Sequence, residues 1–148
     1  QRHLTIPCEM CIRDRLEPDQ FELRNPLWAD KIAELVERRV VPALIPEAEI
    51  NGGLQVEARL YKLLLYAPGG HFKRHRDTEK APGMFGTLIV QLPSEHSGGQ
   101  LAVYDSDGSD RREFDFGQQA GRSMFVNHFA AHYADLEHEI LPIKSGYR

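Results

Sequence analysis

Hydrophobic residues near the start of the chain recur at the spacing of a helix. The stripe comprises Leu27, Trp28, Ile32, Leu35, Val36 and Val40. Apolar residues about every third or fourth position predict an amphipathic helix that packs one face against the core, so we expect Trp28 to be a core residue. Asn25-Pro26 is typical of an N-cap followed by proline at the first helical position. We expect the helix to end near Pro42, because proline disrupts a helix interior.

Beyond residue 53 the spacing of hydrophobic residues changes from a helical period to a period of two residues. Leu54, Val56, Ala58 and Leu60 alternate with polar or amphipathic residues, and this pattern predicts a half-buried strand over residues 54–61. Residues 63–66 read Leu-Leu-Leu-Tyr and are apolar on both faces, so we expect the sheet to be covered on both sides there.

Short apolar runs separated by glycine-rich turns fill the rest of the chain. The predicted strands are residues 86–93, 98–105, 111–116, 123–127 and 138–143. Short strands at nearly regular spacing favour a sandwich or barrel. The predicted fold class is therefore mainly β with an N-terminal helix, an α+β arrangement.

Composition narrows the possible classes of function. A chain of 148 residues is long enough for one domain with its own core, and its net charge of −4 argues against nucleic-acid binding. No apolar run is long enough to cross a membrane. A cytoplasmic location is favoured, although the chain begins without Met. Residues 1–15 have no clear period, and we assign them no function and treat them as a tail or an artefact.

His75 and Asp77 are the first candidates for chemistry. Residues i and i+2 of an extended strand point the same way, so this pair would present an imidazole and a carboxylate side by side. The third ligand must come from another strand, and the downstream candidates are His96, His128, His132 and His138. His138 stands apart because it lies in an apolar strand context, with Arg148 ten residues further on.

Two histidines and one carboxylate on one face of a metal suit a non-haem Fe(II) oxygenase. The opposite face stays open for a 2-oxo acid and for O₂. A dicarboxylate co-substrate also needs a cation at its far end, and a guanidinium fork meets that need better than an ammonium.

With these residues in place, the chain resembles the 2-oxoglutarate- and Fe(II)-dependent dioxygenases, in their prolyl-4-hydroxylase-like branch. The resemblance lies in LYKLLLYAPGGHFKRHRDTE, in GTLIVQLP with GGQLAVYD, and in HYADLEHEILPIKSGYR. It implies a double-stranded β-helix, which is a cupin-like jelly roll. It also implies His75, Asp77 and His138 as iron ligands and catalytic residues, and Arg148 as the anchor of 2-oxoglutarate. Fe(II), 2-oxoglutarate and O₂ are the implied cofactors, with ascorbate as a further candidate.

The resemblance also implies the reaction and its substrate class. The expected reaction hydroxylates a C–H bond, most simply in a prolyl residue of a protein or peptide, and releases succinate and CO₂. The family continues past Arg148 with a hydrophobic strand, so we expect residues 16–148 to form a dioxygenase domain that lacks its last strand.

Three further residues are candidates for the co-substrate pocket. Where a tyrosine of this branch binds the 2-oxoglutarate tail, the chain has Gln91. Thr87 and Gln91 share a strand face that either lines the pocket or is partly solvated. Tyr66 either borders the co-substrate or is a core tyrosine.

Two alternatives belong to other classes of function. One is a non-catalytic or inactivated β-barrel domain that binds a metal or a partner. The other is a cupin-type metal enzyme that uses no 2-oxoglutarate, although such an enzyme has no use for Arg148 at its position. For an iron site at His75, Asp77 and His138, we expect His96, His128 and His132 to lie outside the set of metal ligands.

Overall fold

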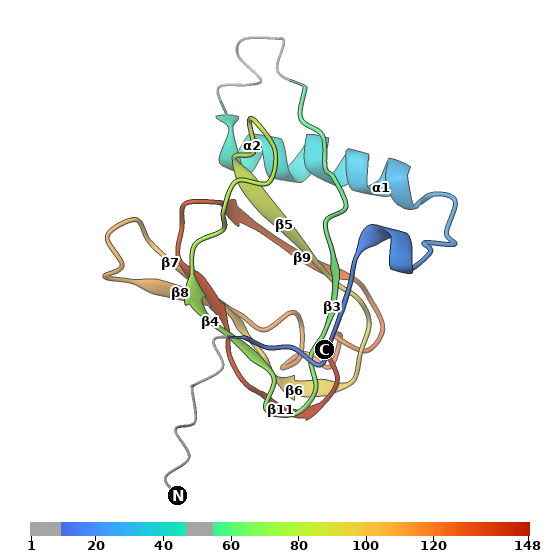
Figure 1. The fold of residues 1–148 in the computed structure, drawn as a ribbon, viewed down its shortest axis with the longest axis vertical. Helices are drawn as coiled ribbons and strands as arrows, with labels where there is room; N and C mark the ends of the chain where they lie inside the picture. Colours follow the sequence, from blue (N-terminus) through green and yellow to red (C-terminus); the bar gives the residue numbers. More distant parts are fainter. Residues whose placement is uncertain (1–9, 47–54) are drawn as a thin grey trace, which may run out of the picture.

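The computed structural model describes residues 10–46 and 55–148, in which short strands follow a helical segment (Figure 1). The helical elements are η1 (Pro18–Gln20), α1 (Trp28–Leu35), the π-helical turn η2 (Val36–Val40) and α2 (Val41–Leu44). The strands are β1 (Met10–Cys11), β2 (Asp14–Leu16), β3 (Leu63–Leu65), β4 (His71–His75), β5 (Gly86–Gln91), β6 (His96–Gly98), β7 (Leu101–Tyr104), β8 (Arg111–Phe114), β9 (His128–Tyr133), β10 (His138–Ile140) and β11 (Ile143–Gly146). The fold is thus mainly β with an N-terminal helix. No helix in the described ranges combines the length and the apolar character that a membrane crossing requires.

The predicted helix is present, but both of its ends differ from the prediction. The Asn25 carbonyl accepts the Trp28 N–H in a turn, so α1 begins at Trp28 rather than at Pro26. Leu27 is 56% exposed and does not belong to the buried face. Helical backbone continues past Pro42 to Leu44, because the proline occupies the first turn of α2, where its missing N–H costs little.

The helical segment lies across one end of the β-structure (Figure 1). The Tyr133 hydroxyl on β9 donates a hydrogen bond to the carbonyl of Leu44. The neighbouring Gly86 on β5 faces the Leu44 side chain. These contacts place α2 over the paired ends of β5 and β9, and Val36 and Val40 are the buried residues of this segment.

The period-two pattern before β3 does not form a strand. Residues 55–62 have no regular secondary structure, Leu60 is 50% exposed, and Leu54 lies outside the described residues. β3 pairs only with β2 among the described strands, and Leu65 is exposed, so the covered sheet expected over residues 63–66 is wrong too. Alternation describes side chains only, and a strand also requires a partner for its backbone.

The predicted strand over residues 123–127 is wrong as well. The N–H groups of Phe125 and Val126 both donate to the Arg122 carbonyl, so this stretch folds into turns. Phe125 is 74% exposed, which removes the burial that a strand there would need. The strand predicted over 111–116 ends at Phe114, because Phe116 adopts a left-handed conformation with φ of 51°.

All pairings among the described strands are antiparallel. The largest sheet has the order β1-β4-β10-β7-β8, and three two-stranded units pair β5 with β9, β6 with β11 and β2 with β3. Residues 10–15 contribute β1 and part of β2. These two strands are too short to show a hydrophobic period in the sequence. The core cluster comprises Tyr66, Leu101, Phe116, Ile140 and Ile143.

The last predicted strand is divided by Leu141-Pro142 into β10 and β11. The chain does not reverse at Ser145-Gly146, because both residues pair with β6 in β11. Gly146 has φ of 72°, and a Cβ added there would clash with the Glu95 carbonyl oxygen. The chain therefore continues along β11 and carries Arg148 to Tyr66.

Candidate active site

Two neighbouring strands of the largest sheet bring His75, Asp77 and His138 together. His75 is the last residue of β4 and lies opposite His138, the first residue of β10. Asp77 lies two residues beyond β4, where its N–H donates to the Ala134 carbonyl at 3.1 Å. One ligand atom from each of the three residues lies within 4.8 Å of the others. The geometry meets the expectation of convergence.

Both histidines are held with Nε2 toward the carboxylate. The Nδ1 atom of His75 donates to the Lys73 carbonyl at 2.7 Å, and that of His138 donates to the Leu136 carbonyl at 3.1 Å. Each Nε2 therefore carries a lone pair, and each lies 3.7 Å from an Asp77 oxygen. The Nε2 atom of His75 is buried without a hydrogen-bond partner. Two bare imidazole nitrogens and a carboxylate fit a divalent iron ion.

The charges also fit metal binding. Burial raises the pKa of Asp77, but the adjacent His75 ring, a hydrogen bond from the Thr87 hydroxyl at 2.5 Å and the nearby histidines hold that pKa well below its usual range. Burial, with His132 beside it, lowers the pKa of His138 to about 4. At neutral pH Asp77 is thus ionised and His138 is neutral, as metal ligands must be.

His132 is the neighbour of the site that the sequence did not reveal. Its ring centroid lies 4.2 Å from that of His138, and the residue is 3% exposed. It stands opposite Thr87 in the β5–β9 pair, and its Nδ1 donates to the Tyr133 carbonyl. The sequence feature that could have indicated its position is its even spacing from His128, which places both side chains on one face of β9. Among the described residues, the ligand cluster contains none of the other candidates His96, His128 and His132.

A second polar group surrounds the side chain of Arg148. Its Nε donates to Gln91 Oε1 at 2.6 Å, and its guanidinium lies 4.8 Å from the centre of the Phe116 ring. Burial lowers the pKa of Arg148 to about 10 and raises the pKa of Tyr66 to about 12. Arg148 is therefore charged at neutral pH and Tyr66 is neutral. Within the described residues, no carboxylate forms an ion pair with this buried cation.

β5 connects the cluster of His75, Asp77 and His138 with the polar residues around Arg148. Thr87 and Gln91 share one face of this strand, and Thr87 contacts Asp77 while Gln91 contacts Arg148. Gln91 is 5% exposed, so this face is buried rather than solvated at that point. The metal candidate and the buried cation consequently face the same interior.

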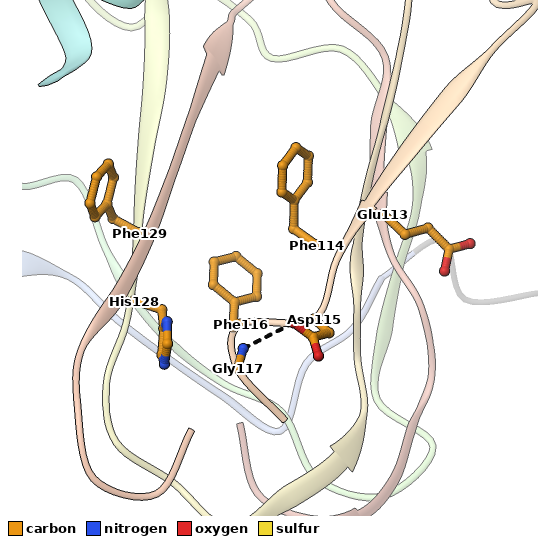
Figure 2. Close-up of a pocket in the computed structure, with 7 residues that line it drawn as sticks. All are labelled: Glu113, Phe114, Asp115, Phe116, Gly117, His128 and Phe129. Atoms are coloured by element: carbon orange, nitrogen blue, oxygen red, sulfur yellow. Dashed lines mark hydrogen bonds between the residues drawn. The ribbon is translucent and has the colours of Figure 1, made fainter. Parts of the chain in front are cut away.

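A pocket of about 290 Å³ is lined by the end of β8, the turn that follows it and the start of β9. In Figure 2 the Phe114 and Phe116 rings lie in the middle of the view, and Phe129 lies to the left of β9, above His128. The N–H of Gly117 donates to Asp115 at 3.0 Å and shapes the turn at its base. The sequence did not indicate this pocket, since its lining comes from segments on two separate strands.

Two imidazoles and one carboxylate on a β scaffold define the ligand set of a mononuclear non-haem iron protein. The profile of the 2OG-Fe(II) oxygenase superfamily matches residues 61–148, more than half of the chain, and the chain belongs to this superfamily. Membership implies Fe(II), 2-oxoglutarate and O₂ as cofactors. No curated protein matches the chain significantly.

One solved structure supports the same fold. A Pseudomonas putida prolyl-4-hydroxylase superposes with a TM-score of 0.50 at 20% sequence identity. The match covers 90% of this chain and 65% of that chain, so this chain spans less than two thirds of the solved protein.

Proposed function

We propose that residues 16–148 form the catalytic domain of an Fe(II)- and 2-oxoglutarate-dependent dioxygenase with a double-stranded β-helix fold. The domain hydroxylates a C–H bond and releases succinate and CO₂. The observation that carries the proposal is the convergence of His75, Asp77 and His138 within 4.8 Å, in an interior that also holds the buried Arg148.

Each residue has a defined task in this proposal. His75 and His138 bind the iron through Nε2, and Asp77 binds it through a carboxylate oxygen. Thr87 fixes the Asp77 carboxylate through its hydroxyl. When bound, the iron and 2-oxoglutarate together supply the oxidising power for C–H hydroxylation. The chain's own residues position them and exclude water.

Arg148 distinguishes this function from the alternatives. A buried guanidinium without a carboxylate partner is costly, and the far carboxylate of 2-oxoglutarate would supply that partner. Tyr66, Gln91 and Thr87 complete the surroundings of the co-substrate. Neither a metal-binding barrel without activity nor a cupin-type enzyme without 2-oxoglutarate accounts for this cation.

The proposed substrate is a prolyl residue in a protein or peptide. Its support is the likeness to a prolyl-4-hydroxylase and the resemblance of the motifs to that branch. Fold and cofactor do not fix a substrate, so the substrate needs its own test.

The test incubates the protein with Fe(II), 2-oxoglutarate, ascorbate and proline-containing peptides, in air and under nitrogen. We expect O₂-dependent succinate release together with peptides that gain one oxygen on a prolyl residue, seen by mass spectrometry. Succinate release without prolyl oxidation would reject the substrate and keep the oxygenase. Absence of both in air, with the iron site loaded, would reject the function itself.

A further inference from the structure

His132 is a buried residue beside the candidate iron site, and the proposed function gives it no task. Its ring centroid lies 4.2 Å from that of His138, and the His75 ring lies 4.3 Å from His138. His132 stands opposite Thr87 in the β5–β9 pair, and residues that face each other across two strands project from the same side of the sheet. The Thr87 hydroxyl on that side contacts Asp77. The His132 side chain therefore extends toward the three candidate ligands.

The hydrogen bond at Nδ1 fixes the proton of the His132 ring. Nδ1 lies 2.9 Å from the Tyr133 carbonyl oxygen, which can only accept, so Nδ1 carries the proton and Nε2 of the neutral ring carries a lone pair. His132 is 3% exposed, and its Nε2 is buried without a hydrogen-bond partner. A buried acceptor without a donor is costly, and this cost favours a donor at Nε2.

The described part of the chain does not supply that donor. No group within it forms a hydrogen bond with His132 Nε2. The Thr87 hydroxyl, across the strand pair, already donates to Asp77. The imidazoles of His75 and His138 direct their Nδ1 hydrogens to backbone carbonyls. The donor for His132 must therefore come from a bound molecule.

Distances separate the two ways in which a metal could meet this lone pair. Two ligand atoms on one metal lie at most about 4.4 Å apart, since each is about 2.0–2.2 Å from the metal. His132 is not part of the cluster whose ligand atoms lie within 4.8 Å of one another, which disfavours direct binding. A water molecule on the metal adds a hydrogen bond of about 2.7–3.2 Å and so reaches an acceptor roughly 5 Å from the metal. Such a water is also a strong donor, because the metal makes it more acidic.

We propose that His132 is a positioning residue whose Nε2 accepts a hydrogen bond from a water molecule on the metal, at a position that the three protein ligands leave open. The inference rests on the proposed function, because it requires a metal at His75, Asp77 and His138. The contact stabilises the hydrated metal. It also opposes replacement of that water by a ligand that has no hydrogen to donate.

The experiment uses Co(II) in place of iron and compares two dissociation constants. One is that of Co(II), and the other is that of azide, titrated at saturating Co(II) and followed by the visible spectrum. Azide binds a metal as an anion without a hydrogen, so in wild type it displaces water against the His132 contact. Paramagnetic proton NMR counts the imidazoles on the metal, because the Nδ1 hydrogens of cobalt-bound histidines are strongly shifted.

We expect His132→Phe to bind Co(II) about 10- to 100-fold more weakly, the range for a hydrogen bond to a charged group, and to bind azide more tightly. Opposite changes in the two constants are the signature of a water contact, because general damage to the fold weakens both. His132→Gln should move both constants back toward wild type, since its amide oxygen can accept near the Nε2 position. His71→Phe is the matched control, because His71 also donates from Nδ1 to a carbonyl, that of Gly69, but lies at the other end of β4 from His75.

Three results would overturn the inference. Equal constants in wild type and His132→Phe, or weaker binding of both Co(II) and azide by the variant, would leave the ring with a packing role only. A third shifted Nδ1 hydrogen in wild type, beside those of His75 and His138, would show that His132 binds the metal itself.

Asp77→Ala tests the site on which the inference rests. If this variant loses Co(II) binding while His132→Phe keeps both wild-type constants, the inference about His132 is wrong and the proposed function stands. If Asp77→Ala binds Co(II) as tightly as wild type, the metal does not bind at this site, and both proposals are rejected.

Discussion

The backbones of Arg148 and Tyr66 exchange two hydrogen bonds. The Tyr66 N–H donates to the Arg148 carbonyl at 2.7 Å, and the Arg148 N–H donates to the Tyr66 carbonyl at 3.0 Å. This antiparallel pair lies directly beyond β3 and fixes the backbone from which the Arg148 side chain enters the interior. Through this pairing the Arg148 side chain reaches Gln91.

The first prediction concerns Arg148. We expect Arg148→Ala to raise the KM for 2-oxoglutarate at least about 30-fold, since truncating one partner of a buried charge pair costs roughly 2–5 kcal/mol. Arg148→Lys should recover only part of the affinity, because an ammonium lacks the bidentate fork. Steady-state kinetics across 2-oxoglutarate concentrations measure the effect, and metal affinity serves as the control. An unchanged KM in Arg148→Ala would exclude the anchor.

The second prediction concerns the hydroxyl that holds Asp77. Thr87→Val removes the hydrogen bond to the carboxylate but keeps the side chain's shape. Removal of a residue that orients a metal ligand typically costs 10- to 100-fold in affinity, so we expect Mn(II) to bind about that much more weakly. Thr78→Val is the matched control, since the exposed Thr78 hydroxyl pairs with Lys80. Equal Mn(II) affinities for the two variants would refute this role.

A third prediction follows from the lowered pKa of His96. Below its ordinary pKa of 6.5 the unfolded chain takes up a proton on His96 that the folded protein resists. The stability that the neutral ring contributes is present above that pKa and is lost as the pH falls. Urea unfolding at about pH 7.5 and about pH 5.5 should show a larger loss for wild type than for His96→Phe, by at most about 1.4 kcal/mol per pH unit. Identical losses would contradict the burial of a neutral ring.

The fourth prediction tests the path of the chain into Arg148. Gly146→Ala adds a methyl group against the Glu95 carbonyl at a residue with positive φ. Gly121 also has positive φ but open space around it, so Gly121→Ala measures the conformational cost alone, about 1 kcal/mol. We expect Gly146→Ala to lower the free energy of unfolding clearly more than Gly121→Ala, by chemical denaturation. Equal losses would mean that β11 does not pack closely on β6.

The prediction from sequence was best for elements whose secondary structure follows from their own hydrophobic pattern. Residues 86–91 and 101–104 form strands as expected, because apolar residues there are buried or half-buried between neighbours. Residues 54–61 and 123–127 carry similar patterns, but no partner strand pairs with the described part of either, and pairing is a property of distant segments. A local hydrophobic pattern does not show whether a distant segment pairs with it.

In the candidate site, too, local spacing predicted one part of the arrangement, and the register of distant strands determines the rest. The i, i+2 spacing made His75 and Asp77 a pair, whereas the residues alone left four histidines as candidates for the third ligand. The resemblance selected His138, and the structure places it opposite His75 through the register of β4 and β10. The contact of His132 with His138 depends on how β9 lies against β10, and nothing local in the sequence encodes that arrangement.

The most direct test of the account is Fe(II)-dependent conversion of 2-oxoglutarate to succinate by wild type and by Asp77→Ala. Asp135→Ala is the matched control, because Asp135 is exposed and lies outside the ligand cluster. We predict succinate release by wild type and by Asp135→Ala, with loss of at least about 100-fold in Asp77→Ala, which removes the carboxylate ligand of the iron. Succinate release by Asp77→Ala at the wild-type rate would contradict an iron centre at His75, Asp77 and His138.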